Sequence, residues 1–166
     1  FSKIFCPGYR IGWVAAAPQI LSKLIFVKQG ADLQASTISQ REVSKFIDVY
    51  DLDAHVEKIK KVYARRRDLM LKTMEETFPE GLQYTYPEGG LFTWVELPSH
   101  LDARKIMERC LENNVAYVPG GSFFPNGGKE NTFRLNYSNM PEEKIVEGIK
   151  RLSVALKEAM TETVEA

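Results

Sequence analysis

The chain is poor in the side chains that hold metals and disulfides. Its 166 residues include two cysteines, Cys6 and Cys110, and two histidines, His55 and His100. The histidines are isolated from each other and from any cysteine cluster, which argues against a metal site. The cysteines lie far apart in the sequence and form no CxxC pair, so we expect a reducing, cytoplasmic compartment, although these two residues could still pair.

The sequence also lacks an excess of charge and a long apolar run. Its 22 basic and 22 acidic residues cancel, which gives no support for nucleic-acid binding, because such binding depends on excess positive charge. No apolar run approaches the roughly 18 residues that a membrane helix needs, and we expect no membrane partner. The chain begins with Phe1 rather than methionine, and we expect it to be part of a longer protein.

Hydrophobic periodicity and turn residues predict a mixture of helices and strands. We expect, in order, a short buried strand at 10–17, a helix at 18–27, a polar loop or helical connection at 29–40, a long helix at 53–78, strands at 82–86 and 90–97, a helix at 102–114 capped by Asp102, strands at 115–118 and 132–138, and a final helix from Glu142. The order from residue 82 onward, β-β-α-β-β-α, predicts an α+β sandwich with helices over one face of a sheet.

Two of these elements carry patterns that predict which side chains face the core. In the strand at 132–138, Phe133, Leu135 and Tyr137 share one face, so Arg134 and Asn136 share the other and point away from the core. The inward residues of the helix at 102–114 are expected to be Ile106, Met107, Cys110 and Leu111. The basic run at 65–67 is expected to be a solvated helix face.

The opening stretch, which reads SK-x3-PG-x-R-x-GW, is the most informative part of the sequence. Lys3 stands among apolar neighbours seven residues before Arg10, with the turn Pro7-Gly8 between them. Apolar surroundings favour the neutral amine, which is the form that attacks a carbonyl. The guanidinium suits a phosphate or a carboxylate.

This stretch resembles the pyridoxal-phosphate lysine signature of the class I and II aminotransferases, which are fold-type-I enzymes. The resemblance implies a cofactor, pyridoxal 5'-phosphate, whose aldehyde binds Lys3 and whose phosphate binds Arg10. It also implies that Lys3 is the catalytic residue, acting as the general base that removes and returns the substrate α-proton.

Three later stretches resemble the same family in the same order. The stretches are PEGGLFTW at 87–94, VAYVPGGSF at 115–123 and NTFRLNYS at 131–138. By resemblance, Arg134 binds the α-carboxylate of the substrate through a two-point contact. The pattern is most similar to the branch that acts on 2-aminoadipate, aromatic or other bulky amino acids, with a 2-oxo acid as the second substrate and a homodimer as the assembly.

The resemblance also implies a domain plan. Residues 1–35 would end a large cofactor-binding domain, residues 36–80 would form a connecting helical region, and residues 81–166 would form a small α+β domain. We expect this chain alone to be inactive, because the family contacts the cofactor ring with residues upstream of the lysine. Three alternatives stay open: another fold-type-I chemistry of the β-lyase kind, the aminotransferase-like sensor domain of a transcriptional regulator, and a small binding module without catalysis.

Overall fold

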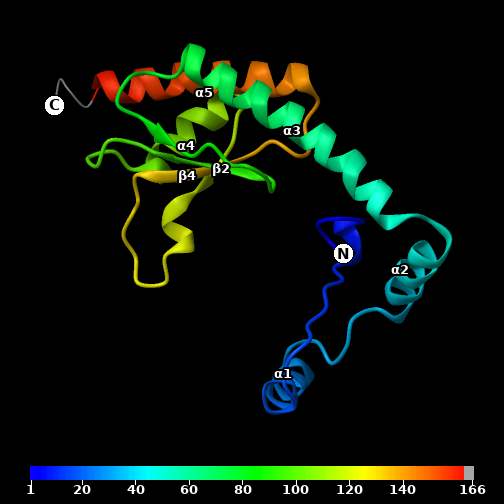
Figure 1. The fold of residues 1–166 in the computed structure, drawn as a ribbon. Helices are drawn as coiled ribbons and strands as arrows, with labels where there is room; N and C mark the ends of the chain where they lie inside the picture. The colour runs from blue at the N-terminus through cyan, green and yellow to red at the C-terminus, as the bar shows by residue number, and fades with distance from the viewer. Residues whose placement is uncertain (163–166) are drawn as a thin grey trace. The chain divides into compact units, whose positions relative to one another are not determined.

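The computed structural model describes residues 1–162 of the chain. The chain divides into two compact units, Phe1–Ile59 and Lys60–Ala166, and each is described by itself. Figure 1 shows a first unit made of helices and connections and a second unit made of a sheet with helices. Within the described residues, no helix is long and apolar enough to cross a membrane.

The first unit contains the helices α1 (Pro18–Ala31) and α2 (Thr37–Val49), the short 3-10 turn η1 (Pro7–Tyr9), and the start of the long helix α3 (Leu52–Thr77). Proline occupies the first turn of α1, where its missing N–H costs no hydrogen bond. The hydroxyl of Ser36 caps α2 by accepting a hydrogen bond from the backbone N–H of Ser39 at 3.3 Å. These signals confirm a helix from Pro18 and resolve the polar segment at 29–40 into two helix ends and a short connection.

The predicted buried strand at 10–17 is wrong. The residues from Ile11 to the start of α1 form neither helix nor strand, and Trp13 is 77% exposed. A strand needs a hydrogen-bonded neighbour, and every regular element described in this unit is helical. The segment is apolar, which is why we predicted a buried strand, but the first unit, all of which is described, has no sheet in which it could be buried.

The second unit is built on a four-stranded antiparallel sheet with the order β1-β2-β4-β3. The strands are β1 (Gln83–Tyr84), β2 (Phe92–Glu96), β3 (Val118–Pro119) and β4 (Thr132–Asn136). Figure 1 shows α4 (Ala103–Glu112) and α5 (Glu142–Glu162) on one side of β2 and β4. This arrangement confirms the predicted β-β-α-β-β-α order, although both edge strands have only two residues. Pro119 helps to end β3 because it has no N–H to donate.

The core lies between the sheet and the helices. Phe133, Leu135 and Tyr137 are at most 5% exposed, which confirms the predicted alternation along β4. The buried stripe of α5 follows the helical period and consists of Ile145, Ile149, Leu152 and Leu156. The helix α3 adds Met70, Leu71 and Met74 to the same core.

Helix α4 begins as predicted but buries a narrower stripe. The carboxylate of Asp102 caps it by accepting hydrogen bonds from the backbone N–H groups of Arg104 at 2.8 Å and Lys105 at 3.4 Å. Ile106 and Cys110 are buried, whereas Leu111 is 57% exposed, so its predicted inward orientation is wrong. Consecutive helical residues are about 100° apart around the axis, and Cys110 already faces the core.

Candidate functional site

The first eleven residues form a loop that a backbone hydrogen bond closes. The carbonyl oxygen of Ile11 accepts from the backbone N–H of Ser2 at 3.1 Å and also from the amino group of Phe1 at 2.9 Å. Lys3 directly follows Ser2, and Arg10 directly precedes Ile11. The two residues that the motif predicts for the cofactor thus each lie next to a residue of this closure.

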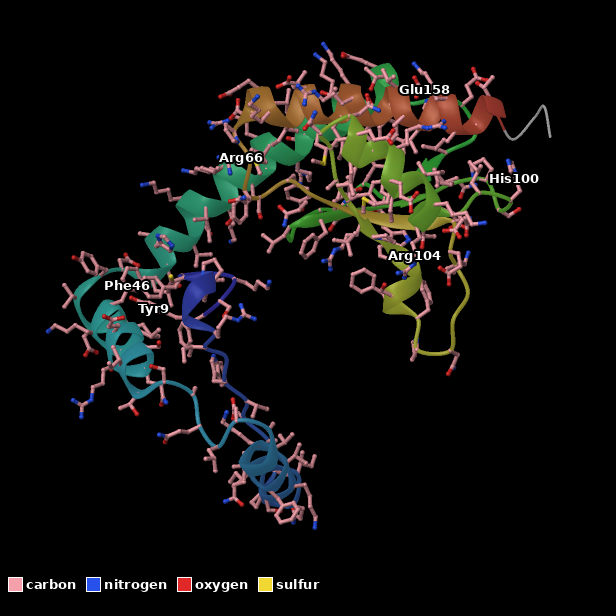
Figure 2. All side chains as sticks on the ribbon, turned by 180° about the vertical axis from the view of Figure 1, so that it is seen from behind. Tyr9, Phe46, Arg66, His100, Arg104 and Glu158 are labelled. Carbon is pink, nitrogen blue, oxygen red and sulfur yellow. The ribbon has the colours of Figure 1, made fainter. Side chains whose placement is uncertain are left out.

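Lys3 is exposed, which corrects the apolar setting that its neighbours predict. Phe5, two residues later, packs instead on Phe46 of α2 with ring centroids 4.1 Å apart, and on Tyr9 at 5.7 Å. Figure 2 labels Tyr9 and Phe46 close together beside η1 and α2. The apolar residues next to Lys3 thus pack within the first unit and do not cover the lysine. The amine of Lys3 has no hydrogen bond or ion pair with any described residue.

Arg10 is held in place from one side. Its backbone adopts the left-handed conformation, with φ 55° and ψ 36°, directly after the 3-10 turn. Its Nη1 donates a hydrogen bond to the carbonyl of Pro7 at 3.0 Å. No carboxylate of the described chain pairs with its exposed guanidinium, so its other N–H donors remain able to bind an anion.

Arg134 lies in the middle of β4, in the second unit. Its backbone is paired with Trp94 on one side and with Val118 on the other. The side chain is half-buried and projects, as predicted, from the face opposite Phe133 and Leu135. Its guanidinium carbon lies 3.9 Å from the ring centre of Phe92 and 4.6 Å from that of Phe123.

The guanidinium of Arg134 forms no hydrogen bond or ion pair with residues in the described part of the chain. A cavity of about 410 Å³ includes Arg134 in its lining, but it is walled by the core residues Leu135, Ile145 and Ile149 and by neither of the rings that contact the guanidinium. It therefore lies on the face of the sheet away from the guanidinium. Lys3 and Arg10 do not line the cavity of about 600 Å³ found beside Ile11 and Trp13 in the first unit.

Phe92 and Phe123 are site residues that the sequence prediction did not include. Phe92 had a recoverable signal, because it and Trp94 alternate with the buried Thr93 and Val95 and so share the open face with Arg134. Phe123 ends the 3-10 turn η2 (Gly120–Phe123), whose direction no periodic pattern predicts.

An ion pair lies on the same face of the sheet. The amine of Lys129 contacts the carboxylate of Glu96 at 2.8 Å. The hydrogen bond from Lys129 holds the pKa of Glu96 below its usual value, and the positive charge of Lys129 acts in the same direction. The carboxylate of Glu96 is therefore already paired with the amine of Lys129.

The cysteines and histidines form no site in the described structure. Among residues 1–162, no three His, Cys, Asp or Glu side chains gather in an arrangement that could hold a metal ion. Cys6 and Cys110 are both free thiols. Burial raises the pKa of Cys110 to about 11, which makes it a poor nucleophile at neutral pH.

Comparisons with known proteins agree with the motifs. Residues 1–152 match the family model described as aminotransferase class I and II. The chain is 48% identical to aromatic-amino-acid aminotransferase 1 of Thermococcus litoralis over 160 residues, which cover 96% of this chain and 38% of that protein. It is also similar to the crystal structure of LysN, an alpha-aminoadipate aminotransferase from Thermus thermophilus complexed with N-(5'-phosphopyridoxyl)-L-leucine. That match has a TM-score of 0.90 and 40% identity, and it covers 95% of this chain and 40% of that one.

A weaker similarity connects the chain to a different class of protein. An uncharacterized HTH-type transcriptional regulator, YdfD of Bacillus subtilis, is 27% identical over 157 residues, which are 95% of this chain and 32% of that protein. The chain thus spans two-fifths or less of the length of each of these relatives.

Proposed function

The chain belongs to the class I and II aminotransferase family, and we propose that the whole protein is a pyridoxal-phosphate-dependent aminotransferase that moves an amino group between an amino acid and a 2-oxo acid. One observation carries this proposal beyond family membership. The closed loop at the start of the chain brings Lys3 and Arg10 next to its closure, and no described carboxylate pairs with either.

The residues present fit the proposed cofactor. Pyridoxal phosphate has an aldehyde, which an amine binds, and a phosphate, which a guanidinium binds. Lys3 offers the amine and Arg10 the guanidinium. When bound, the cofactor would withdraw electrons from the α-carbon of the substrate.

Each of the three residues has a separate task in this proposal. The amine of Lys3 acts as the general base: it removes the α-proton of the amino acid and later returns a proton. An amine that is not held in an ion pair is able to do this. Arg10 holds the phosphate through the N–H donors that it does not give to Pro7. Arg134 binds the α-carboxylate and so orients the α-carbon of the substrate.

The substrate range, the domain roles and the assembly are further parts of the proposal. We infer a preference for aromatic or other bulky amino acids, which the names of the relatives support. Residues 1–35 and 81–166 would belong to the large and small domains, in a cytoplasmic homodimer.

A regulator with an aminotransferase-like sensor domain is the second candidate, because of the 27% identity to YdfD. The two candidates differ in turnover rather than in cofactor binding. A regulator would bind pyridoxal phosphate and an amino acid without releasing a 2-oxo acid. A β-lyase would instead break a bond at the β-carbon and release the β-substituent, a 2-oxo acid and free ammonia.

The deciding experiment uses the whole protein loaded with pyridoxal phosphate. We expect phenylalanine to give stoichiometric phenylpyruvate and, with 2-oxoglutarate present, glutamate rather than ammonia. Lys3→Ala should abolish this transfer and remove the borohydride-trapped cofactor from the Lys3 peptide, whereas Lys23→Ala, an exposed lysine of α1, should leave both unchanged. Cofactor binding without amino-group transfer would contradict the proposal and favour the regulator. The 166-residue chain alone should show neither a trapped cofactor nor transfer.

A further inference from the structure

The guanidinium of Arg134 is held by aromatic rings rather than by a carboxylate. Its central carbon lies 3.9 Å from the ring centre of Phe92 and 4.6 Å from that of Phe123, both well inside the distance of about 6 Å at which a ring face attracts a cation. Because Arg134 has no other side-chain partner in the described chain, these two rings are what positions its guanidinium.

The chemistry of such a support matters for an anion-binding arginine. A carboxylate partner would occupy N–H donors of the guanidinium and would compete with any incoming anion. A ring attracts the same positive charge through its π electrons and takes no conventional hydrogen-bond acceptor site. Two phenylalanines can therefore restrict the side chain while its donors stay free for a carboxylate ligand.

The ring of Phe92 is fixed by the turn that precedes β2. In that turn, Nη1 of Arg67 donates to the carbonyl of Glu88 at 2.9 Å, and the hydroxyl of Tyr137 donates to the carbonyl of Gly89 at 2.9 Å. These bonds tie the turn to α3 and to the residue that follows β4. The position of Phe92 thus depends on α3 and on the strand that carries Arg134.

The ring of Phe123 is fixed from a different direction. Its edge contacts Trp94, with ring centroids 5.6 Å apart, and Trp94 is the backbone partner of Arg134. The neighbouring Ser122 accepts a hydrogen bond from Nη2 of Arg104 at 3.2 Å, and Figure 2 shows Arg104 above this turn. The two rings thus rest on different contacts, and β2 takes part in both because it carries Phe92 and Trp94.

The carboxylate of Glu96, on the same face of β2 as Phe92, is paired with a lysine. Glu96 lies opposite Thr132, the residue two before Arg134, so it is a diagonal neighbour of Arg134 across the two strands. Its carboxylate is paired with Lys129 at 2.8 Å. This pairing removes Glu96 as an internal competitor for the guanidinium of Arg134.

We propose that Phe92 and Phe123 are positioning residues that clamp Arg134 in the orientation in which it binds the carboxylate of the substrate. This inference rests on the proposed function for its substrate, but the clamp itself concerns the binding of any carboxylate at Arg134. The clamp acts on binding of the substrate rather than on proton transfer at Lys3.

The test uses the whole protein loaded with pyridoxal phosphate and four variants. Phe92→Leu and Phe123→Leu remove each ring, and Phe92→Tyr restores an aromatic face. Phe124→Leu is the matched control, because Phe124 is the next residue of the same loop and contacts Trp94 at 6.2 Å rather than Arg134. Thermal melting checks that every variant is folded.

Two measurements separate positioning from a structural effect. We expect each leucine variant to raise the KM for phenylalanine by roughly tenfold, the scale of a lost cation–π contact, with kcat changed less than about twofold. The Kd for 3-phenylpropionate, a carboxylate without an amino group, should weaken in parallel. The Kd for phenethylamine, which has no carboxylate, should not change, and Phe92→Tyr and Phe124→Leu should behave as the unmodified protein.

A second readout needs no turnover. In the unmodified protein, the NMR signal of the Arg134 Nε–H, assigned by its loss in Arg134→Lys, should be shifted by the ring currents of both phenylalanines and should move further on addition of 3-phenylpropionate. An unshifted signal, or leucine variants that bind 3-phenylpropionate as tightly as the unmodified protein, would overturn the clamp. A protein that lacks amino-group transfer but shows the ring-current shift and the loss of 3-phenylpropionate binding would retain the clamp and lose the proposed function.

Discussion

Arg67 on helix α3 donates a hydrogen bond from Nη1 to the carbonyl of Glu88 at 2.9 Å, and the same nitrogen reaches the carbonyl of Pro87 at 3.2 Å. Its side chain is only 21% exposed. This contact joins a helix residue to the turn that leads into β2 and Phe92. It corrects the expectation that the basic run at 65–67 is a solvated face, because Arg66 also turns inward and donates to the carbonyl of Ser138 at 2.5 Å.

Replacing Arg67 by methionine should loosen this turn while keeping the apolar stem of the side chain. The loss of hydrogen bonds from a charged donor should cost about 1–2 kcal/mol of local stability. We expect amides in the turn at 87–91 to exchange roughly tenfold faster in hydrogen-exchange mass spectrometry. The control is Arg65→Met, whose side chain is 65% exposed and pairs with Glu142; its turn amides should exchange as before. Equal exchange in Arg67→Met and the unmodified protein would contradict the anchoring role.

Gly120 should not tolerate a side chain. A Cβ atom there would lie 1.9 Å from Oγ1 of Thr132 and 2.8 Å from Cζ2 of Trp94. Thr132 is itself buried, so the clash cannot be relieved without moving β4. Gly120→Ala should therefore lower the free energy of unfolding by about 1–3 kcal/mol, measured as a shift of the urea midpoint. Gly89→Ala is the control, because nothing lies within 4 Å of its added Cβ; a comparable loss in both variants would show that the close approach at Gly120 is not the cause.

The pKa of Glu96 should rise when Lys129 is replaced by methionine. The hydrogen bond and charge of Lys129 lower the pKa of Glu96 in the folded protein. A carboxyl whose folded pKa is depressed stabilises the protein above its unfolded pKa, and that contribution is lost as the pH falls through the folded pKa. In Lys129→Met the titration midpoint, followed by the ¹³C chemical shift of the carboxyl carbon, should move up toward the ordinary value for glutamate. Lys72→Met, which removes an exposed lysine on α3 that pairs with Glu76, should leave the Glu96 titration in place.

The two thiols should differ in reactivity in the folded protein. Cys110 is fully buried, and burial raises its pKa to about 11, whereas Cys6 is half-buried in the opening loop. Brief treatment with iodoacetamide at pH 8 should label Cys6 and spare Cys110, as read from the two peptides by mass spectrometry. In urea both residues should be labelled. Labelling of Cys110 at the rate of Cys6 in the native protein would show that helix α4 opens readily.

Local sequence patterns were sufficient for four of the five helices described and for the central strands, whereas α2 (Thr37–Val49) was not predicted as a helix. The stripe of α5 and the alternation along β4 are set by spacing alone, since each residue's face follows from the period of its element. The cap at Asp102 is equally local. The edge strands and the segment at 10–17 were predicted less well, because the extent of a strand depends on a neighbour that is often distant in sequence.

The sequence by itself determined the family, the order of elements in the second unit, and the identity of Lys3, Arg10 and Arg134 as the proposed site residues. It did so because short motifs carry chemistry at defined spacings. Only the tertiary structure decided how those side chains are held. The loop closure at Ile11 joins the two ends of the segment that carries Lys3 and Arg10, and the register of β2 with β4 and the turn at Phe123 bring two rings to Arg134. These contacts join residues far apart in the chain, and no local periodicity encodes such a meeting.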